Sequence, residues 1–159
     1  VPGTEGAKTF EPDSEYIIPL GKALVAQEAS AEAIENGESC TVITYGMGVY
    51  WAKAVSKKFK GRIEILDLRT LNPLDWEAVV ASVKRHNKAL VLTEEPLMNS
   101  FAESLAGRIS QHCFQVLDAP VMAYGAENLP AIALNVDLEK AMLPTPEKVE
   151  KVIGDLLNY

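Results

Sequence analysis

The chain has 159 residues, of which 48% are hydrophobic, so it can bury one well-developed core but is short for two ordinary domains. Its formal net charge is −7, which disfavours binding to nucleic acid because such binding depends on neutralising phosphates. No apolar run approaches the roughly 20 residues of a membrane-spanning helix, so we expect neither a nucleic-acid nor a membrane partner.

The first residues differ in character from the rest of the chain. Residues 1–15 carry Pro, Gly and acidic side chains without periodicity, and we expect a linker or tail there and one folded domain over 16–159. Val1 is not an initiator methionine. We therefore expect the chain to come from a longer polypeptide.

The start of the folded part combines two patterns. Residues 22–26 are compatible with a short strand, whereas the composition of 27–35 favours a helix. The pair Asn36-Gly37 is typical of a helix end.

From Cys40 onwards, strand-like and helix-like patterns alternate. The apolar runs 40–46, 62–69 and 88–95 predict buried strands. Apolar residues recur at helical spacing between these strands, as Val49, Ala52, Val55 and Phe59 and then as Trp76, Val79, Val80 and Val83. Asp75 can cap the second of the two helices.

The remaining part predicts two further helices and two short strands. Residues 100–103 match a capping box ahead of an apolar stripe, and Thr145-Pro146 opens the last helix. The segments 113–120 and 121–125 are short strand candidates, separated by Pro120, which cannot donate to a central ladder. Such alternation predicts an α/β domain with a largely parallel sheet and helices on both faces.

The first strand-helix unit has almost the layout of a dinucleotide-binding unit. Gly46 and Gly48 follow a buried strand, and Asp67 ends the next strand 21 positions after Gly46, where such units bind the ribose. The third small position of the fingerprint is Trp51, however, and an indole there would push the helix away or fill the space of the phosphate. We therefore favour a tight turn, with Asp67 bonded to its own loop or to Arg69, and keep an NAD-binding oxidoreductase as the alternative.

Other polar side chains suggest no obvious catalytic set. His86 and His112 lie near predicted helix ends, where we expect them to face water and complement the helix terminus. Glu94-Glu95 stands at the carboxyl end of a strand, where open α/β sheets bind ligands. For this pair, capping and loop contacts are favoured over a base or metal site. The residues alone therefore predict no catalytic, cofactor-binding or metal site.

The cysteines and the basic cluster have simple interpretations. Cys40 and Cys113 lack the spacing of a zinc site or a disulfide framework, so we expect small buried residues in a reduced, intracellular setting. The basic residues of 57–62 are expected to form a solvated face.

Several strings follow one another in a recognisable order. They are YIIPLGKA, TVITYGMGV, EILDLRTLNPLD, SVKRHNKALVLTEEP, FAESLAGRI, CFQVLDAPV and LPTPEKV. Together they resemble the carboxyl-terminal domain of the β subunit of thiamine-diphosphate-dependent 2-oxoacid dehydrogenases, within the transketolase carboxyl-terminal domain group. The resemblance covers roughly 16–159. The strings TEEPL, FAES and LLNY look closer to branched-chain (2-oxoisovalerate) than to pyruvate dehydrogenases.

The resemblance implies a three-layer αβα domain with a mixed, mostly parallel five-stranded sheet whose first strand is antiparallel. It also implies that thiamine diphosphate and magnesium bind outside this domain, between the pyrimidine-binding domain of the β subunit and the α subunit. The whole enzyme would decarboxylate a 2-oxoacid and transfer the acyl group to lipoamide, in a bacterial cytoplasm or a mitochondrial matrix. The isolated domain would be inactive.

The same resemblance implies partners rather than chemistry for this domain. A second β subunit, an α subunit (or the α half of a fused chain) and the acyltransferase component are the expected partners. The family places the acyltransferase contact at positions that correspond to Asp118 and Tyr159. The alternatives are a turn-capping role for Asp118 and a frayed end for Tyr159. A transketolase or deoxyxylulose-phosphate synthase domain is a further alternative for the whole chain.

This sequence departs from the family pattern at three places. Asn99-Ser100 stands where a pair of glycines is usual, Ala123 aligns with a usual arginine, and the segment 27–36 is longer than usual. We therefore expect the loop after Glu95 to differ from that of the family. We also expect this chain to lack any anion or salt-bridge contact that the arginine makes in the family.

Overall fold

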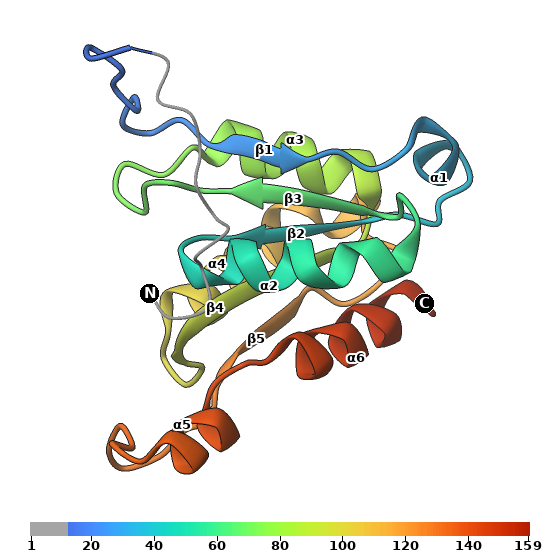
Figure 1. The fold of residues 1–159 in the computed structure, drawn as a ribbon. Helices are drawn as coiled ribbons and strands as arrows, with labels where there is room; N and C mark the ends of the chain where they lie inside the picture. Colours follow the sequence, from blue (N-terminus) through green and yellow to red (C-terminus); the bar gives the residue numbers. More distant parts are fainter. Residues whose placement is uncertain (1–12) are drawn as a thin grey trace.

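The computed structural model describes residues 13–159, so most of the expected tail lies outside the described part. Five strands form one sheet in the order β1-β3-β2-β4-β5 (Figure 1). The strands are β1 (Leu24–Gln27), β2 (Cys40–Thr44), β3 (Ile63–Asp67), β4 (Ala89–Pro96) and β5 (Met122–Ala126).

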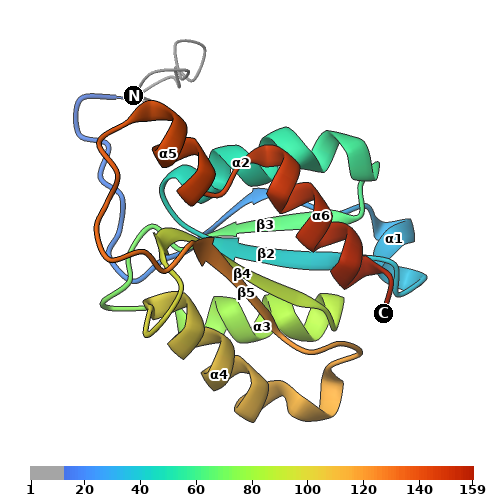
Figure 2. The same ribbon diagram turned by 90° about the horizontal axis from the view of Figure 1, so that it is seen from below.

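Helices cover both faces of this sheet (Figure 2). They are α1 (Ala31–Glu35), α2 (Met47–Ser56), α3 (Trp76–His86), α4 (Phe101–Cys113), α5 (Val136–Met142) and α6 (Pro146–Leu157). Short 3-10 turns, η1 (Lys57–Phe59) and η2 (Phe114–Val116), extend α2 and α4. Between residues 13 and 159, no helix combines the length and the apolar character needed to cross a lipid bilayer.

The topology confirms the expected mixed sheet. β1 pairs antiparallel with β3, while β3, β2, β4 and β5 run parallel to one another. The four parallel strands therefore end together at one edge, here named the carboxyl edge, and begin together at the opposite, amino edge. Figures 1 and 2 place α1 and the end of α6 at the amino edge and α5 on the side of the carboxyl edge.

Two apolar cores hold the three layers together. Buried residues of α2 and α6 pack with β2, β3 and β4 on one face, and those of α3 and α4 pack on the other. All five residues of β2 are buried, as a central strand covered on both faces requires. Burial of this apolar surface is the main stabilising contribution to the domain.

Helix starts follow the capping residues that the sequence predicts. The side chains of Asp75, Ser100 and Thr145 accept hydrogen bonds from backbone N–H groups in the first turns of α3, α4 and α6. These predictions are confirmed. The α1 helix is shorter than the predicted 27–35, because Gln27 ends β1 and Ser30 caps the helix.

The predicted strand over 113–120 is wrong. Cys113 instead is the last buried residue of α4, and the 3-10 turn η2 continues the helical path to Val116. The Asp118 N–H then donates to the carbonyl of Asn87 in the turn before β4, at an N–O distance of 2.9 Å. An apolar run that extends a helix looks like a short strand when only its composition is read.

Candidate functional site

The turn between β2 and α2 has a structural explanation that needs no nucleotide. Gly46 adopts a φ of 57°, which glycine tolerates without strain. A Cβ atom on Gly48 would lie only 1.9 Å from Thr44 Oγ1, so a side chain of β2 fills the space beside this glycine. Trp51 is half-buried and packs against the core that α2 and α6 cover. The two glycines therefore serve the turn and the close packing of helix on strand.

Asp67 also acts locally, as one of the two interpretations predicts. Its Oδ1 atom accepts a hydrogen bond from the backbone N–H of Arg69 at 3.1 Å. This bond supports a loop in which Arg69 has a positive φ of 56°. Asp67 is thus engaged in the β3–α3 loop.

The carboxyl ends of β2 and β4 carry a polar cluster around Glu95. Its Oε1 atom accepts hydrogen bonds from the Tyr45 hydroxyl and from the backbone N–H of Phe101, both at 3.0 Å. Burial, chiefly, raises the pKa of Tyr45, so this hydroxyl remains a donor at neutral pH. Glu95 therefore fixes the start of α4, as the capping interpretation predicts, while Glu94 is exposed to solvent.

A second polar cluster is buried near the amino edge, between β3 and α3. Glu64 is 1% exposed, and its Oε2 atom lies 3.1 Å from His86 Nε2 and 3.0 Å from an Arg85 nitrogen. Ser82 donates to the other oxygen of Glu64, and Ser39 Oγ lies 2.7 Å from His86 Nδ1. The expectation that His86 faces water is wrong, because this imidazole is only 2% exposed.

The charge of Glu64 is retained inside the protein. Its burial opposes ionisation, but the contacts with His86, Ser82 and Arg85 outweigh the burial and lower the pKa below 4.5. A substrate could not reach Glu64 or His86 without local unfolding, because both are almost completely buried. We interpret the cluster as a structural link between β3 and α3 rather than as a catalytic set.

His112 differs from His86 because it is exposed, as predicted. Its ring meets the Trp76 indole edge-on at a centroid distance of 5.3 Å, and the Arg108 guanidinium lies 3.9 Å from the centre of the same indole. These contacts join α4 to α3.

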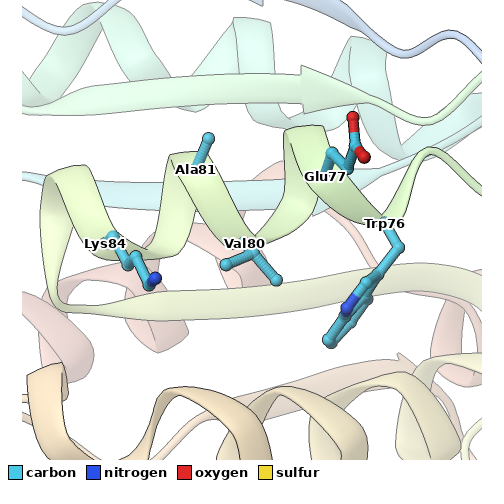
Figure 3. A pocket seen from close by; sticks show the side chains of 5 residues that line it. All are labelled: Trp76, Glu77, Val80, Ala81 and Lys84. Carbon is cyan, nitrogen blue, oxygen red and sulfur yellow. The ribbon is translucent and has the colours of Figure 1, made fainter.

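Beside them, an open groove of about 420 Å³ runs along the outer side of α3 (Figure 3). It is lined by Trp76, Glu77, Val80, Ala81 and Lys84. All five residues belong to one helix. Sites for small ligands usually bring a few polar groups together from several elements, and this groove does not.

Neither cysteine belongs to a reactive centre. Both are buried and free of disulfides, as predicted, and burial raises the pKa of the Cys40 thiol to about 12. Within residues 13–159, no group of three or more His, Cys, Asp or Glu side chains is arranged to hold a metal ion.

The amino edge presents a different kind of surface. Asp118 and Tyr159, the two residues that the family resemblance selects, are both exposed, and Tyr159 retains 68% of its accessible surface. The loop that carries Asp118 and the end of α6 lie at this same edge in both views (Figures 1 and 2). The Asp118 carboxylate makes no hydrogen bond or ion pair with the described part of the chain, so the alternative of a turn cap is not observed.

Sequence reasoning missed one residue of this surface, Phe114. Its ring is 78% exposed on η2, four residues before Asp118. The predicted strand over 113–120 gave no reason to expect an exposed ring at this position. Exposed acidic residues, Glu35 and Glu38, lie at the same edge in and after α1. We name Phe114, Asp118 and Tyr159 the amino-edge surface; its ring-and-acid character suits an apolar partner with basic groups.

Comparisons with known proteins agree with this architecture. The family model described as "Transketolase, C-terminal domain" matches residues 29–149. The 2-oxoisovalerate dehydrogenase subunit beta of Bacillus subtilis (strain 168) is 32% identical over 151 residues, which are 93% of this chain and 44% of that protein. The pyruvate dehydrogenase E1 component subunit beta of Cyanidium caldarium is also 32% identical, over 155 residues, covering 96% of this chain and 45% of that protein.

A solved structure supports the fold. It is a split-gene transketolase described as an inactive beta4 tetramer, with a TM-score of 0.71, 20% sequence identity and coverage of 95% of this chain and 45% of that one. At this identity the likeness shows the fold alone. The chain spans a little under half the length of these relatives.

Proposed function

The chain belongs to the transketolase C-terminal domain family, and we propose that it is the C-terminal assembly domain of a β-type subunit from a thiamine-diphosphate-dependent 2-oxoacid dehydrogenase. Two relatives that match over more than nine-tenths of the chain carry such names. The enzyme would act on 2-oxoisovalerate or pyruvate and transfer an acyl group to lipoamide. This domain would contribute contacts between subunits.

The observation that carries the proposal is that Glu95, Glu64 and His86 are engaged in the fold itself. Glu95 holds the start of α4, and Glu64 of β3 and His86 of α3 are buried against each other. The side chain of Thr44 fills the space beside Gly48 that a phosphate-binding turn would leave open. The residues present therefore do not fit thiamine diphosphate with magnesium, and we propose that this cofactor is bound outside the domain.

For the amino-edge surface we propose docking of the acyltransferase component. Asp118 offers an exposed carboxylate to a basic docking domain, and the exposed rings of Phe114 and Tyr159 at the same edge offer apolar contact. Opposite charges raise the rate of association, and buried aromatic side chains often dominate binding energy. A second β subunit and an α subunit (or the α half of a fused chain) are the other proposed partners.

Two alternatives have weaker support. An NAD-binding oxidoreductase needs an open phosphate turn, which the Gly48–Thr44 packing closes. A transketolase or deoxyxylulose-phosphate synthase domain shares the fold, but the named sequence relatives favour the dehydrogenase branch. Two free, buried cysteines support our proposal of an intracellular location, in a bacterial cytoplasm or a mitochondrial matrix.

Reconstitution tests the proposal. The longer polypeptide that contains this domain is combined with an α subunit of the same organism, and decarboxylation of 2-oxoisovalerate and of pyruvate is followed with thiamine diphosphate and Mg²⁺. We expect turnover only with both subunits and the cofactor, and none from the 159-residue chain. Absence of turnover with both substrates, together with saturable NADH fluorescence on the chain alone, would refute it.

A further inference from the structure

The exposed apolar side chains of this domain gather mainly on the carboxyl-edge side. Six of them are Met98 in the β4–α4 loop and Leu129, Ile132, Leu134, Val136 and Leu138 in and before α5. More lie in residues 16–20, which precede β1 at the same edge (Figure 1). So many exposed apolar side chains at one edge are uncommon on isolated soluble proteins and usually mark an interface.

The segment around α5 is held in place with these side chains turned outward. Asn128 accepts a hydrogen bond from the Met98 N–H at 2.8 Å, which ties the segment to the β4–α4 loop. Asn135 caps α5, and buried Met142 anchors its end. Leu134 nevertheless remains fully exposed. The fold thus presents this surface in a defined conformation without covering it.

The acidic side chains near this surface argue against a second copy of this chain as the partner that covers it. Three exposed carboxylates, those of Glu127, Asp137 and Glu139, lie in and before α5. Of the basic side chains there, Lys140 is exposed, and Lys148 donates hydrogen bonds to the carbonyls of Ala141 and Leu143. Two-fold pairing of this face with itself would bring the carboxylates of both copies together. A cover with apolar side chains and a basic rim fits better.

The relatives are longer than this chain, and their additional part is a candidate for the partner that covers this surface. This chain accounts for 44% and 45% of the two named β subunits, and its family model is that of a C-terminal domain, so the remaining part precedes it. The first described residues also enter the fold on the carboxyl-edge side (Figures 1 and 2). A preceding domain joined there would have a high effective concentration at this surface.

We propose that the carboxyl-edge surface, made of residues 16–20, Met98 and 129–138, binds the domain that precedes this one in the longer polypeptide. The inference rests on the proposed function, because it assumes the two-domain plan of the β-type relatives. The preceding domain would present apolar side chains bordered by Lys or Arg. The edge at which many α/β sheets bind small ligands would here be covered by protein.

Hydrogen exchange tests this proposal directly. Amide exchange over 129–143 is compared between the 159-residue chain and the longer polypeptide. We expect at least tenfold slower exchange in the longer polypeptide, and we expect Leu134→Asp combined with Val136→Asp to abolish the difference. Phe114→Asp is the matched control, because it places the same charge on an exposed apolar position at the opposite edge and should leave the protection intact.

Three outcomes would overturn the inference. They are equal exchange in the two proteins, protection in the short chain that rises with its concentration, and a gene that encodes no domain ahead of this one. Decarboxylation by the reconstituted enzyme is measured on the same samples. Slower amide exchange without decarboxylation would support the interface and reject the proposed function. Decarboxylation without slower exchange would support the proposed function and reject the interface.

Discussion

Gly48 lies so close to Thr44 that a Cβ atom added to it would stand 1.9 Å from the Thr44 hydroxyl oxygen. The same hydroxyl donates to the carbonyl of Leu92 on the neighbouring strand at 2.9 Å. One side chain thus joins β2 to β4 and occupies the space beside the first turn of α2. The glycine pair that looks like part of a nucleotide motif is explained by this packing.

Gly48→Ala should therefore destabilise the domain. We expect the free energy of unfolding to fall by about 3 kcal/mol, because the added methyl group meets a well-packed strand. Thr44→Ala alone should cost about 1.5 kcal/mol through the lost hydrogen bond. In the double variant the main clash is gone, so its loss should be smaller than the sum of the two. Urea denaturation measures all three, and strict additivity would contradict the close contact.

The buried cluster around Glu64 should contribute strongly to stability. Glu64→Gln removes the negative charge that faces His86 and Arg85, and we expect it to lower the free energy of unfolding by about 3 kcal/mol at pH 7. Glu94→Gln is the matched control, because Glu94 is exposed on the following strand. Equal stabilities of the two variants would show that the cluster is dispensable.

The same variant should also change the response to acid. The pKa of Glu64 in the folded protein is below its ordinary value of 4.5, so its contribution is present above about pH 4.5. It is lost as the pH falls from there through the folded-state pKa. The stability gap between the original protein and Glu64→Gln should therefore narrow between pH 5 and pH 3. A gap that stays constant in urea denaturation over this range would contradict a lowered pKa.

Asp75 should couple the segment before β1 to α3. Its two oxygens accept hydrogen bonds from the N–H groups of Ala78 and Ala23, and the bond from Ala23 is the main cause that lowers its pKa. Asp75→Ala should cost about 2 kcal/mol and speed amide exchange over 20–27. Asp75→Asn can keep the helix cap and should cost less. Unchanged exchange over 20–27 in Asp75→Ala would disprove the link.

The thiols should be inert in the folded protein. Burial raises the pKa of Cys40 to about 12 and also raises that of Cys113, so neither supplies much thiolate at pH 8. A thiol reagent such as dithionitrobenzoate should react with both cysteines in guanidinium chloride and with neither within minutes under native conditions. Rapid native labelling of one thiol would reveal an opening that the fold does not show.

Much of this fold can be predicted from residue patterns because the signals are local. β2, β3 and β4 are rich in apolar and β-branched residues, and Asp75, Ser100 and Thr145 are capping residues directly ahead of apolar stripes. The family resemblance is confirmed by the family match and supplied the antiparallel β1. Helix α5 was not predicted, because seven residues capped by Asn135 give little periodicity to detect.

The features that escaped prediction depend on contacts between distant segments. His86 is buried because Glu64 and Ser39, 22 and 47 residues away, meet it inside the fold. Phe114 is exposed because α4 continues as η2 instead of ending before a strand. Neither partner choice nor side-chain exposure can be derived from the residues around these positions alone.

Docking of the acyltransferase component is tested most directly by calorimetric titration of its subunit-binding domain into the 159-residue chain. We predict saturable binding that weakens with salt and that falls at least tenfold when Asp118→Ala is combined with removal of Tyr159, with unchanged thermal stability. Asp155→Ala, an exposed acid in the last turns of α6, is the matched control and should bind as the original chain does. Undiminished binding by the Asp118 and Tyr159 variant would contradict a docking role for the amino-edge surface.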